Sequence, residues 1–184
     1  MRTFIALDLT SQELRSNISS VQKRIAKTGA SPKIIEPDKV HFTMRFLGEV
    51  DQALLEEIRS RLGKLKTAVF SVSFVGLGAF PSADRISVIW IGVDEESAKK
   101  MKSLAYEIGE SLNDLPLKRE GRPFAPHLTI ARVRSESGTG DLRDIIEAES
   151  SQHFGEETFA QLKLKKSDLT RHGPIYTDLE VIDL

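Results

Sequence analysis

The sequence predicts an α+β fold in which two similar lobes share a single domain of residues 1–184. Three observations support this: the chain length, the alternation of strand and helix patterns, and a short motif that occurs twice at matching places. A chain of 184 residues suits one domain, or two small lobes with a common core. With 40% hydrophobic and 29% charged residues, the composition is that of an ordinary globular domain.

The first half of the chain alternates strand and helix patterns. Residues 2–9 are rich in β-forming side chains, and residues 41–48 and 69–80 are two further strands. Ser11 and Asp51 are expected N-caps of the two intervening helices. Apolar residues at intervals of three and four mark the buried helix faces: Leu14, Ile18, Val21 and Ile25 in the first helix, and Leu55, Ile58, Leu62 and Leu65 in the second.

The second half repeats this order and adds a closing strand. Its expected elements are a strand over 86–93, a helix over 95–112, a strand over 127–133, a short helix over 142–150, one long strand over 157–169 and a last strand over 175–184. The recurrence indicates an internal duplication of element order. We therefore expect halves of about 1–82 and 83–184 to form the two lobes, because no Gly/Ser-rich linker separates them.

Composition excludes several classes of site. The chain has no cysteine, which excludes disulfides, thiolate nucleophiles and cysteine-based metal centres. The net charge of −1 means that any nucleic-acid contact must come from a local basic patch. The apolar runs are far shorter than the roughly 20 residues of a membrane span. The opening residues MRTFIALDLT alternate like a strand and not like a signal peptide, so a cytoplasmic location without membrane contact is expected.

A His-x-Thr motif occurs in the second strand of each half, as His41–Thr43 in HFTMRFLG and as His127–Thr129 in HLTIARV. On a strand, residues two apart point to the same face, so each histidine lies beside its threonine. The residues between them, Phe42 and Leu128, should point into the core. If the lobes pair with approximate two-fold symmetry, both motifs face one groove.

Two imidazoles and two hydroxyls in one groove suit phosphodiester chemistry. The ordinary imidazole pKa of about 6.5 lets one ring act as a base while the other acts as an acid near neutral pH. Threonine hydroxyls donate hydrogen bonds to the phosphate oxygens on which charge gathers. Neither motif has a second histidine, aspartate or glutamate at metal-ligand spacing, so we expect no metal and no other cofactor.

HFTMRFLG and PHLTIARV resemble the two HxTx signature motifs of the 2H phosphoesterase superfamily. The flanking segments RTFIALDL, GLGAFPSADRISVIWIGV and SDLTRHGPIYTDLEVIDL are similar to the RNA 2′,3′-cyclic phosphodiesterase (LigT-like, 2′-5′ RNA ligase) branch. The resemblance covers nearly the whole chain. It implies two lobes of antiparallel sheet around a central groove, and a hydrolase that converts a terminal 2′,3′-cyclic phosphate to a 2′-phosphate. It also implies that His41 is the proton donor and His127 the proton acceptor, a division that the two similar motifs do not reveal.

Further candidate substrate-binding residues lie near the motifs. Arg45 lies two residues beyond Thr43 and is expected on the same strand face. Arg132 lies three beyond Thr129, which points it to the opposite face unless a bulge intervenes, although its position matches an arginine common in the branch. Phe124 is a candidate for stacking on a base, and Tyr176 for lining the groove. Phe46 is expected in the core, the loop residues Lys118, Arg119 and Arg122 form a basic segment, and His153 and His172 are expected at the surface or in loops.

Other readings remain open at this stage. The same histidines would serve a 2′-5′ RNA ligase, in which an RNA 5′-hydroxyl replaces water. A non-catalytic module that binds RNA ends or nucleotides would need no acid/base pair. The natural partner is RNA with a 2′,3′-cyclic phosphate end, as in a tRNA half or an oligonucleotide, or a small cyclic nucleotide, and a monomer is the default oligomeric state.

Overall fold

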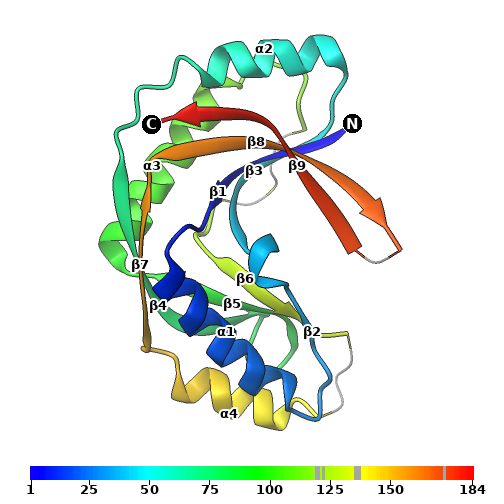
Figure 1. Ribbon diagram of the computed structural model, residues 1–184, viewed down its shortest axis with the longest axis vertical. Helices are drawn as coiled ribbons and strands as arrows, with labels where there is room; N and C mark the ends of the chain where they lie inside the picture. Colours follow the sequence, from blue (N-terminus) through cyan, green and yellow to red (C-terminus); the bar gives the residue numbers. More distant parts are fainter. Residues whose placement is uncertain (119–120, 122, 135–137, 172) are drawn as a thin grey trace.

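The computed structural model describes residues 1–118, 121, 123–134, 138–171 and 173–184, and the statements below concern these residues. Two antiparallel sheets and four α-helices make up the fold (Figure 1). The strands are β1 (Arg2–Asp8), β2 (Lys33–Ile34), β3 (His41–Glu49), β4 (Phe70–Pro81), β5 (Ile86–Val93), β6 (Leu128–Arg132), β7 (His153–Phe159), β8 (Gln161–Thr170) and β9 (Gly173–Asp183). The helices are α1 (Gln12–Ala26), α2 (Gln52–Leu62), α3 (Glu95–Ser111) and α4 (Gly140–Ala148), and η1 (Pro37–Lys39) is a single 3₁₀ turn.

The α+β prediction with antiparallel sheets is confirmed, but the sheets do not follow the two halves of the chain. The four-stranded sheet has the order β3-β1-β8-β9, and the five-stranded sheet has the order β2-β6-β5-β4-β7. Each sheet therefore takes strands from both sides of residue 82, so the expected lobes of about 1–82 and 83–184 do not correspond to the sheets. The physical reason is that β1 and β4 pair with C-terminal strands: β1 with β8, and β4 with β7.

The prediction of one strand over 157–169 is also wrong. The chain forms β7 up to Phe159, leaves the five-stranded sheet at Ala160, and enters the four-stranded sheet as β8. Ala160 O accepts a hydrogen bond from Leu184 N at 2.9 Å, so the crossing point is tied to the end of β9. Both sheets bury one face, so buried and exposed side chains continue to alternate where the chain passes from one sheet to the other. The sequence periodicity therefore does not reveal the end of β7.

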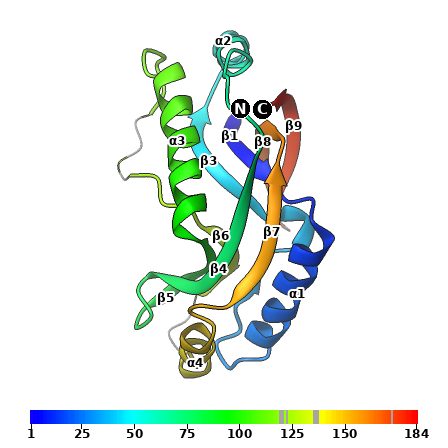
Figure 2. The same ribbon diagram turned by 90° about the vertical axis from the view of Figure 1, so that its left-hand side faces the viewer.

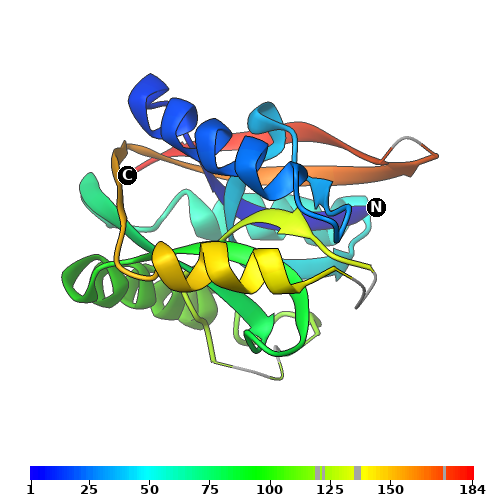
Figure 3. The same cartoon turned by 90° about the horizontal axis from the view of Figure 1, so that it is seen from below.

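The helices cover the sheets from outside. Figures 2 and 3 show α1 and α3 on opposite sides of the molecule, with α4 between them at one end. The expected N-caps hold, since Ser11 Oγ accepts from Leu14 N and a carboxylate oxygen of Asp51 accepts from Leu54 N. The predicted apolar stripes are buried, except that Leu65 lies beyond α2 and is only partly buried. No helix among the described residues is long and apolar enough to cross a membrane.

The two motif strands approach each other where the sheets meet. Cα atoms of β3 and β6 come within 8 Å of one another at several positions, and Figure 1 shows both strands near the middle of the molecule. As expected, Phe42 and Leu128 are fully buried, and the Phe42 ring lies 5.6 Å from that of Phe74 between centroids. The core therefore holds both motif strands from behind.

A buried carboxylate ties the two sheets together at the start of α1. Glu157 on β7 is 3% exposed and accepts three hydrogen bonds, from Thr10 N at 2.6 Å, Ser11 N at 2.7 Å and Thr10 Oγ1 at 2.7 Å. These donors lie directly after β1 of the other sheet. The carboxylate also lies at the helix N-terminus, where the dipole favours negative charge. This contact positions β1, and hence its neighbour β3, relative to the five-stranded sheet.

We expect Glu157→Ala to lower the free energy of unfolding by at least about 2 kcal/mol, because it leaves buried donors without an acceptor. The measurement is chemical denaturation followed by circular dichroism. Glu156→Ala, an exposed glutamate on the same strand, is the matched control and should change the free energy by less than about 0.5 kcal/mol. Equal effects of the two substitutions would contradict the role given to Glu157.

Candidate active site

Both motif histidines are held in the same way by the backbone. His41 Nδ1 lies 2.8 Å from Lys39 O, and His127 Nδ1 lies 2.7 Å from Ala125 O, so each ring binds the carbonyl two residues before it. A carbonyl oxygen only accepts, so Nδ1 must carry the proton in both rings. The opposite nitrogen, Nε2, is then left to gain or lose a proton in each imidazole.

Aromatic rings flank the imidazole of His41. The Phe4 ring lies 5.1 Å away between centroids, and the Tyr176 ring meets the imidazole edge-on, also at 5.1 Å. A cavity of about 550 Å³ opens beside them, which we call the His41 cavity. It is lined by Asp8, Asp38, Lys39, His41, Lys165, Ile175, Tyr176, Thr177 and Asp178. Tyr176, a predicted groove residue, thus contacts a predicted catalytic residue and lines a cavity with it.

Burial lowers the pKa of His41 below its ordinary value of 6.5, because the charged imidazolium loses water. The hydrogen bond to Lys39 O and the Asp8 carboxylate act in the opposite direction, and the Lys165 ammonium again lowers the pKa. Protonation of His41 is therefore harder in the folded protein than in the unfolded chain. Burial also raises the pKa of Tyr176 above 10, so its hydroxyl stays neutral and able to donate.

His127 has an aromatic neighbour of its own on the five-stranded sheet. The Phe80 ring meets the imidazole edge-on at 5.0 Å, and it lies 5.2 Å from the ring of Trp90. Trp90 in turn lies across Gly78 on β4, so closely that a Cβ at Gly78 would overlap the indole. A glycine is therefore required at position 78. The indole packs against Phe80, and Phe80 packs against the imidazole of His127.

Thr43 lies on the same sheet face as His41, and Thr129 lies near the start of β6, which begins directly after His127. Asp8 and Ala6 of β1 pair with His41 and Thr43, and residues two apart share a face. On the other sheet, Thr129 pairs with Trp90. We call the face with His41 and Thr43 the inner face of the four-stranded sheet, and the face with Thr129 and Trp90 the inner face of the five-stranded sheet. Both threonines are partly exposed, so their hydroxyls are accessible to a ligand.

A β-bulge directly after Thr43 reverses the expected direction of Arg45. Ala6 pairs with Thr43 but Ile5 pairs with Arg45, so Met44 is an extra residue in β3. Arg45 therefore leaves the inner face, and its Nη1 donates to Gly109 O at 3.3 Å and Ile108 O at 3.5 Å near the end of α3. The prediction that Arg45 shares the face of Thr43 is wrong for this reason.

The same bulge brings Phe46 to the inner face, although the sequence pattern predicts it in the core. Phe46 pairs with Phe4, its ring centroid lies 6.3 Å from that of Phe4, and the side chain is 58% exposed. Phe4 also contacts His41. Strict alternation along β3 gives no signal for this position, because the bulge shifts the period by one residue.

A matching bulge follows Thr129 and turns Arg132 to the inner face. Trp90 pairs with Thr129 and Val88 with Arg132, and these two β5 residues share a face, so Ile130 is the extra residue. The bulge carbonyl, Ile130 O, accepts from Ile35 N and from Nε2 of the buried Gln22 of α1, both at 3.0 Å. The bulge that an inward-facing Arg132 requires is thus present.

The charge of Arg132 on the five-stranded sheet acts on Tyr176 of the four-stranded sheet. It is exposed at the end of β6, and its positive charge is the first of those that lower the pKa of Tyr176, against the larger effect of burial. Tyr176 lies on β9 of the other sheet and touches His41. His41 and Tyr176 are therefore in contact on the four-stranded sheet, and β6 of the five-stranded sheet, which begins directly after His127, carries both Thr129 and Arg132.

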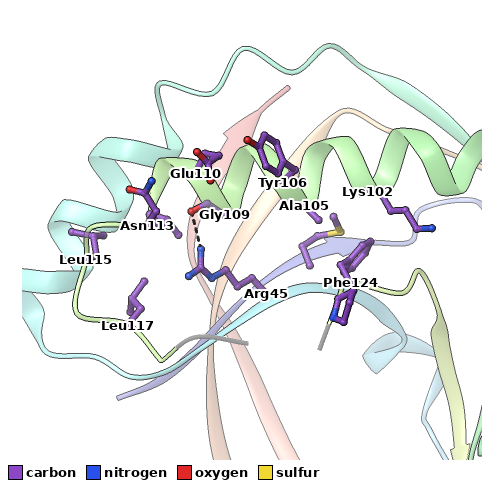
Figure 4. Close-up of a pocket in the computed structure, with 13 residues that line it drawn as sticks. Arg45, Lys102, Ala105, Tyr106, Gly109, Glu110, Asn113, Leu115, Leu117 and Phe124 are labelled. Atoms are coloured by element: carbon purple, nitrogen blue, oxygen red, sulfur yellow. Dashed lines mark hydrogen bonds between the residues drawn. The ribbon is translucent and has the colours of Figure 1, made fainter. Parts of the chain in front are cut away.

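Phe124 is partly buried beside a second cavity, and its role in base stacking stays a prediction. This cavity of about 750 Å³ lies between α3, β3 and the segment after α3, where Figure 4 shows Phe124 together with Arg45, Lys102 and Tyr106. Of the basic loop, Arg119 and Arg122 lie outside the described residues, as does His172. His153 is exposed, as expected, although it lies on β7, where its Nε2 is 3.0 Å from Ser73 Oγ.

A charged cluster on the inner face of the four-stranded sheet is absent from the sequence predictions. Asp8, Lys163, Lys165 and Asp178 come from three neighbouring strands and are linked by ion pairs beside His41. Its signal in the sequence consists only of polar residues at alternate positions of strand segments. Among the described residues, no three histidine, aspartate or glutamate side chains form a group that would hold a metal ion.

Comparison with known proteins gives a consistent result. The family model of the AKAP7 2′5′ RNA ligase-like domain matches residues 2–184. An RNA 2′,3′-cyclic phosphodiesterase of Archaeoglobus fulgidus is 37% identical over 183 residues, which is 100% of both chains. A protein of the same name from Methanocaldococcus jannaschii is 36% identical over 96% of both chains.

Solved structures agree with the fold. A crystal structure of a Thermus thermophilus protein superimposes with a TM-score of 0.79 at 25% identity, covering 100% of this chain and 98% of that one. The crystal structure of E. coli LigT complexed with 3′-AMP gives a TM-score of 0.81 at 22% identity, covering 100% and 97%. The resemblance that the sequence motifs indicated is thereby confirmed.

We expect Gly78→Ala to displace the indole of Trp90 and to destabilise the protein by about 1–3 kcal/mol, the usual cost of overpacking. Trp90 is the only tryptophan in the chain, so intrinsic fluorescence reports the displacement directly. The control is Gly109→Ala in α3, where a Cβ meets nothing within 4 Å. An unchanged emission spectrum and an unchanged unfolding midpoint for Gly78→Ala would refute the close contact.

Proposed function

Because the chain belongs to the AKAP7 2′5′ RNA ligase-like family, we propose that it is an RNA 2′,3′-cyclic phosphodiesterase. It hydrolyses a terminal 2′,3′-cyclic phosphate to a 2′-phosphate by acid/base catalysis with His41 and His127, without a metal ion. The observation that carries this proposal is the matched hydrogen bond from Nδ1 of each motif histidine to the carbonyl two residues before it. It supports two imidazoles that each use Nε2 for proton transfer.

The proposed reaction is an in-line displacement at phosphorus. Nε2 of neutral His127 takes a proton from water as the water oxygen attacks the phosphorus. The bond from phosphorus to the 3′ oxygen breaks, and Nε2–H of protonated His41 gives its proton to that oxygen. The products are a 3′-hydroxyl and a 2′-phosphate. The division of roles between the two rings comes from the family resemblance.

The threonines and Arg132 bind the phosphate in this proposal. The hydroxyls of Thr43 and Thr129 donate to the non-bridging oxygens, where negative charge increases in the transition state. The guanidinium of Arg132, exposed near Tyr176, supplies positive charge for the phosphate or for the neighbouring RNA backbone. Tyr176 keeps its proton, because burial raises its pKa, and can donate to a substrate oxygen.

The lowered pKa of His41 acts against its proposed role as the proton donor. The lowered pKa favours the neutral form of His41 in the free protein, whereas the proton donor must be protonated. An anionic phosphate bound beside the ring favours the charged imidazolium, so substrate binding raises the pKa of His41 and the ring takes up a proton from the solvent. The cytoplasmic location, the monomeric state and a role in tRNA processing remain predictions from the sequence.

The central experiment offers the protein a nucleoside 2′,3′-cyclic phosphate in EDTA and identifies the product isomer by phosphorus NMR. We expect a 2′-phosphate, and a loss of turnover of at least about a hundredfold in His41→Ala and in His127→Ala. His153→Ala, an exposed histidine on β7, should retain wild-type turnover. A 3′-phosphate product, activity that disappears in EDTA, or a motif variant with normal turnover would each contradict the proposal.

Thr43→Val and Thr129→Val keep the volume of the side chain but remove the hydroxyl. Each should lose about 2–4 kcal/mol of transition-state stabilisation, measured as a fall in kcat/KM, if the hydroxyl donates to the developing charge. Thr158→Val on β7, at the opposite edge of the five-stranded sheet from β6 and β2, is the control for the same change of shape away from the motif strands. A double variant with normal kcat/KM would remove both threonines from the site.

An RNA 2′-5′ ligase would use the same side chains with an RNA 5′-hydroxyl in place of water. The two reactions are separated by incubating the protein with one RNA that ends in a cyclic phosphate and a second RNA that begins with a 5′-hydroxyl. Hydrolysis leaves both RNAs at their original lengths, whereas ligation gives a product of the summed length. We expect hydrolysis to dominate, because water is the more abundant nucleophile.

A further inference from the structure

Four charged side chains form a closed ring of ion pairs on the inner face of the four-stranded sheet. Asp8 Oδ2 lies 3.0 Å from Lys163 Nζ and 2.8 Å from Lys165 Nζ. Asp178 completes the ring, with Oδ2 at 2.8 Å from Lys163 Nζ and Oδ1 at 2.6 Å from Lys165 Nζ. Each lysine therefore touches both aspartates, and the four charges sum to zero.

The ring is unusual because much of it is shielded from solvent. Lys165 is only 7% exposed and Asp8 and Lys163 are partly buried, whereas Asp178 is the most exposed of the four. Removing such charges from water costs several kcal/mol per ion, and apolar side chains of similar volume often stabilise a fold equally well. The stability of the fold therefore does not by itself explain four charged side chains at this place. Clusters of this kind are characteristic of sites where protonation is adjusted.

The ring adjoins His41 directly. Asp8 is the cross-strand partner of His41 on the inner face, and Asp8, Lys165 and Asp178 line the His41 cavity together with the imidazole. Directly paired residues in an antiparallel sheet have Cβ atoms about 4.5–5.5 Å apart. The negative charge of Asp8 is therefore close enough to stabilise the imidazolium. The positive charges of Lys163 and Lys165 oppose this effect, because both lysines form ion pairs with Asp8.

We propose that Asp8 is a positioning residue that keeps His41 able to hold a proton, and that Lys165 balances it so that the proton can also leave. The inference rests on the proposed function for its effect on turnover, but its effect on His41 is independent of any activity. Without Asp8, the ring beside the imidazole would hold two ammonium groups and only one carboxylate. Without Lys165, the ring would hold two carboxylates and one ammonium group.

The charges and titratable groups around His41 all enter this balance. Asp8 raises and Lys165 lowers the pKa of His41, against a background of burial that lowers it most. Lys163 and Lys165 hold the pKa of Asp178 below its ordinary value although burial alone would raise it, so the ring stays ionised. The titratable and charged groups that line the His41 cavity are Asp8 from β1, Asp38 and Lys39 from η1, Lys165 from β8, and Tyr176 and Asp178 from β9. Lys163 pairs with both aspartates of the ring, and the charge of Arg132 acts on Tyr176.

The first test is an NMR titration of the His41 imidazole in the absence of substrate. Asp8→Asn removes one negative charge, so the pKa of His41 should fall by roughly 0.5–1 unit. Lys165→Met should raise it by a similar amount, and the double variant should return it close to the wild-type value. Asp183→Asn, at the far end of β9, makes the same change of charge on the same sheet and should leave the pKa unmoved.

The second test is the pH dependence of kcat/KM on a nucleoside 2′,3′-cyclic phosphate. If His41 is the proton donor, the alkaline limb moves to lower pH in Asp8→Asn and to higher pH in Lys165→Met. Above the pKa, the protonated fraction falls tenfold per unit, so Asp8→Asn should lose about three- to tenfold at pH 7.5 and little at its own optimum. A merely structural role would lower the rate equally at all pH values.

The outcomes separate the two hypotheses. An unchanged His41 titration in folded Asp8→Asn and Lys165→Met overturns the inference, whatever the activity of the wild type. Shifted titrations with movement of the acidic limb support the inference but overturn the proton-donor role of His41. Absence of cyclic phosphodiesterase activity in the wild type contradicts the proposed function alone. Circular dichroism and thermal unfolding establish that each variant is folded over the pH range, and Asp8→Glu, which restores the carboxylate, is the second variant if Asp8→Asn unfolds.

Discussion

The hydrogen bond from each motif histidine to the carbonyl two residues before it is the constraint on which the site depends. At 2.8 Å for His41 and 2.7 Å for His127, these bonds set the proton on Nδ1 and leave Nε2 for exchange. A rotated ring would lose this bond and point the wrong nitrogen at a substrate. The other side chains near the imidazoles contact rings whose orientation is set by these backbone hydrogen bonds.

The inner faces add support that differs between the two sheets. On one side, His41 contacts Phe4 and Tyr176, which also contact each other, and lies beside a partly buried ring of charges. On the other, His127 meets Phe80, which packs on an indole that lies over a glycine. Two similar motifs are therefore placed in dissimilar electrostatic surroundings.

The paired bulges show how a repeated motif can carry different chemistry. In both motif strands one extra residue follows the threonine, Met44 in β3 and Ile130 in β6. The residue three positions beyond each threonine then shares the sheet face of that threonine, and it is Phe46 in one strand and Arg132 in the other. One strand thus offers an aromatic ring and the other a guanidinium. Gln22 of α1 bonds the bulge carbonyl of β6, so a helix far away in sequence helps to hold this arrangement.

The sequence by itself determined the local features: the helix stripes with their Ser11 and Asp51 caps, the buried Phe42 and Leu128, the adjacency of each histidine and threonine, and the family. Those follow from side-chain period and capping chemistry within a few residues. Only the tertiary structure decided which segments share a sheet, that β7 and β8 part at Ala160, that Arg45 turns away and Phe46 turns in, and that Asp8 meets Lys165. Each of these depends on strand pairing between distant segments or on an inserted bulge residue, and a one-residue change of register exchanges the two faces of a strand without altering its pattern of alternation.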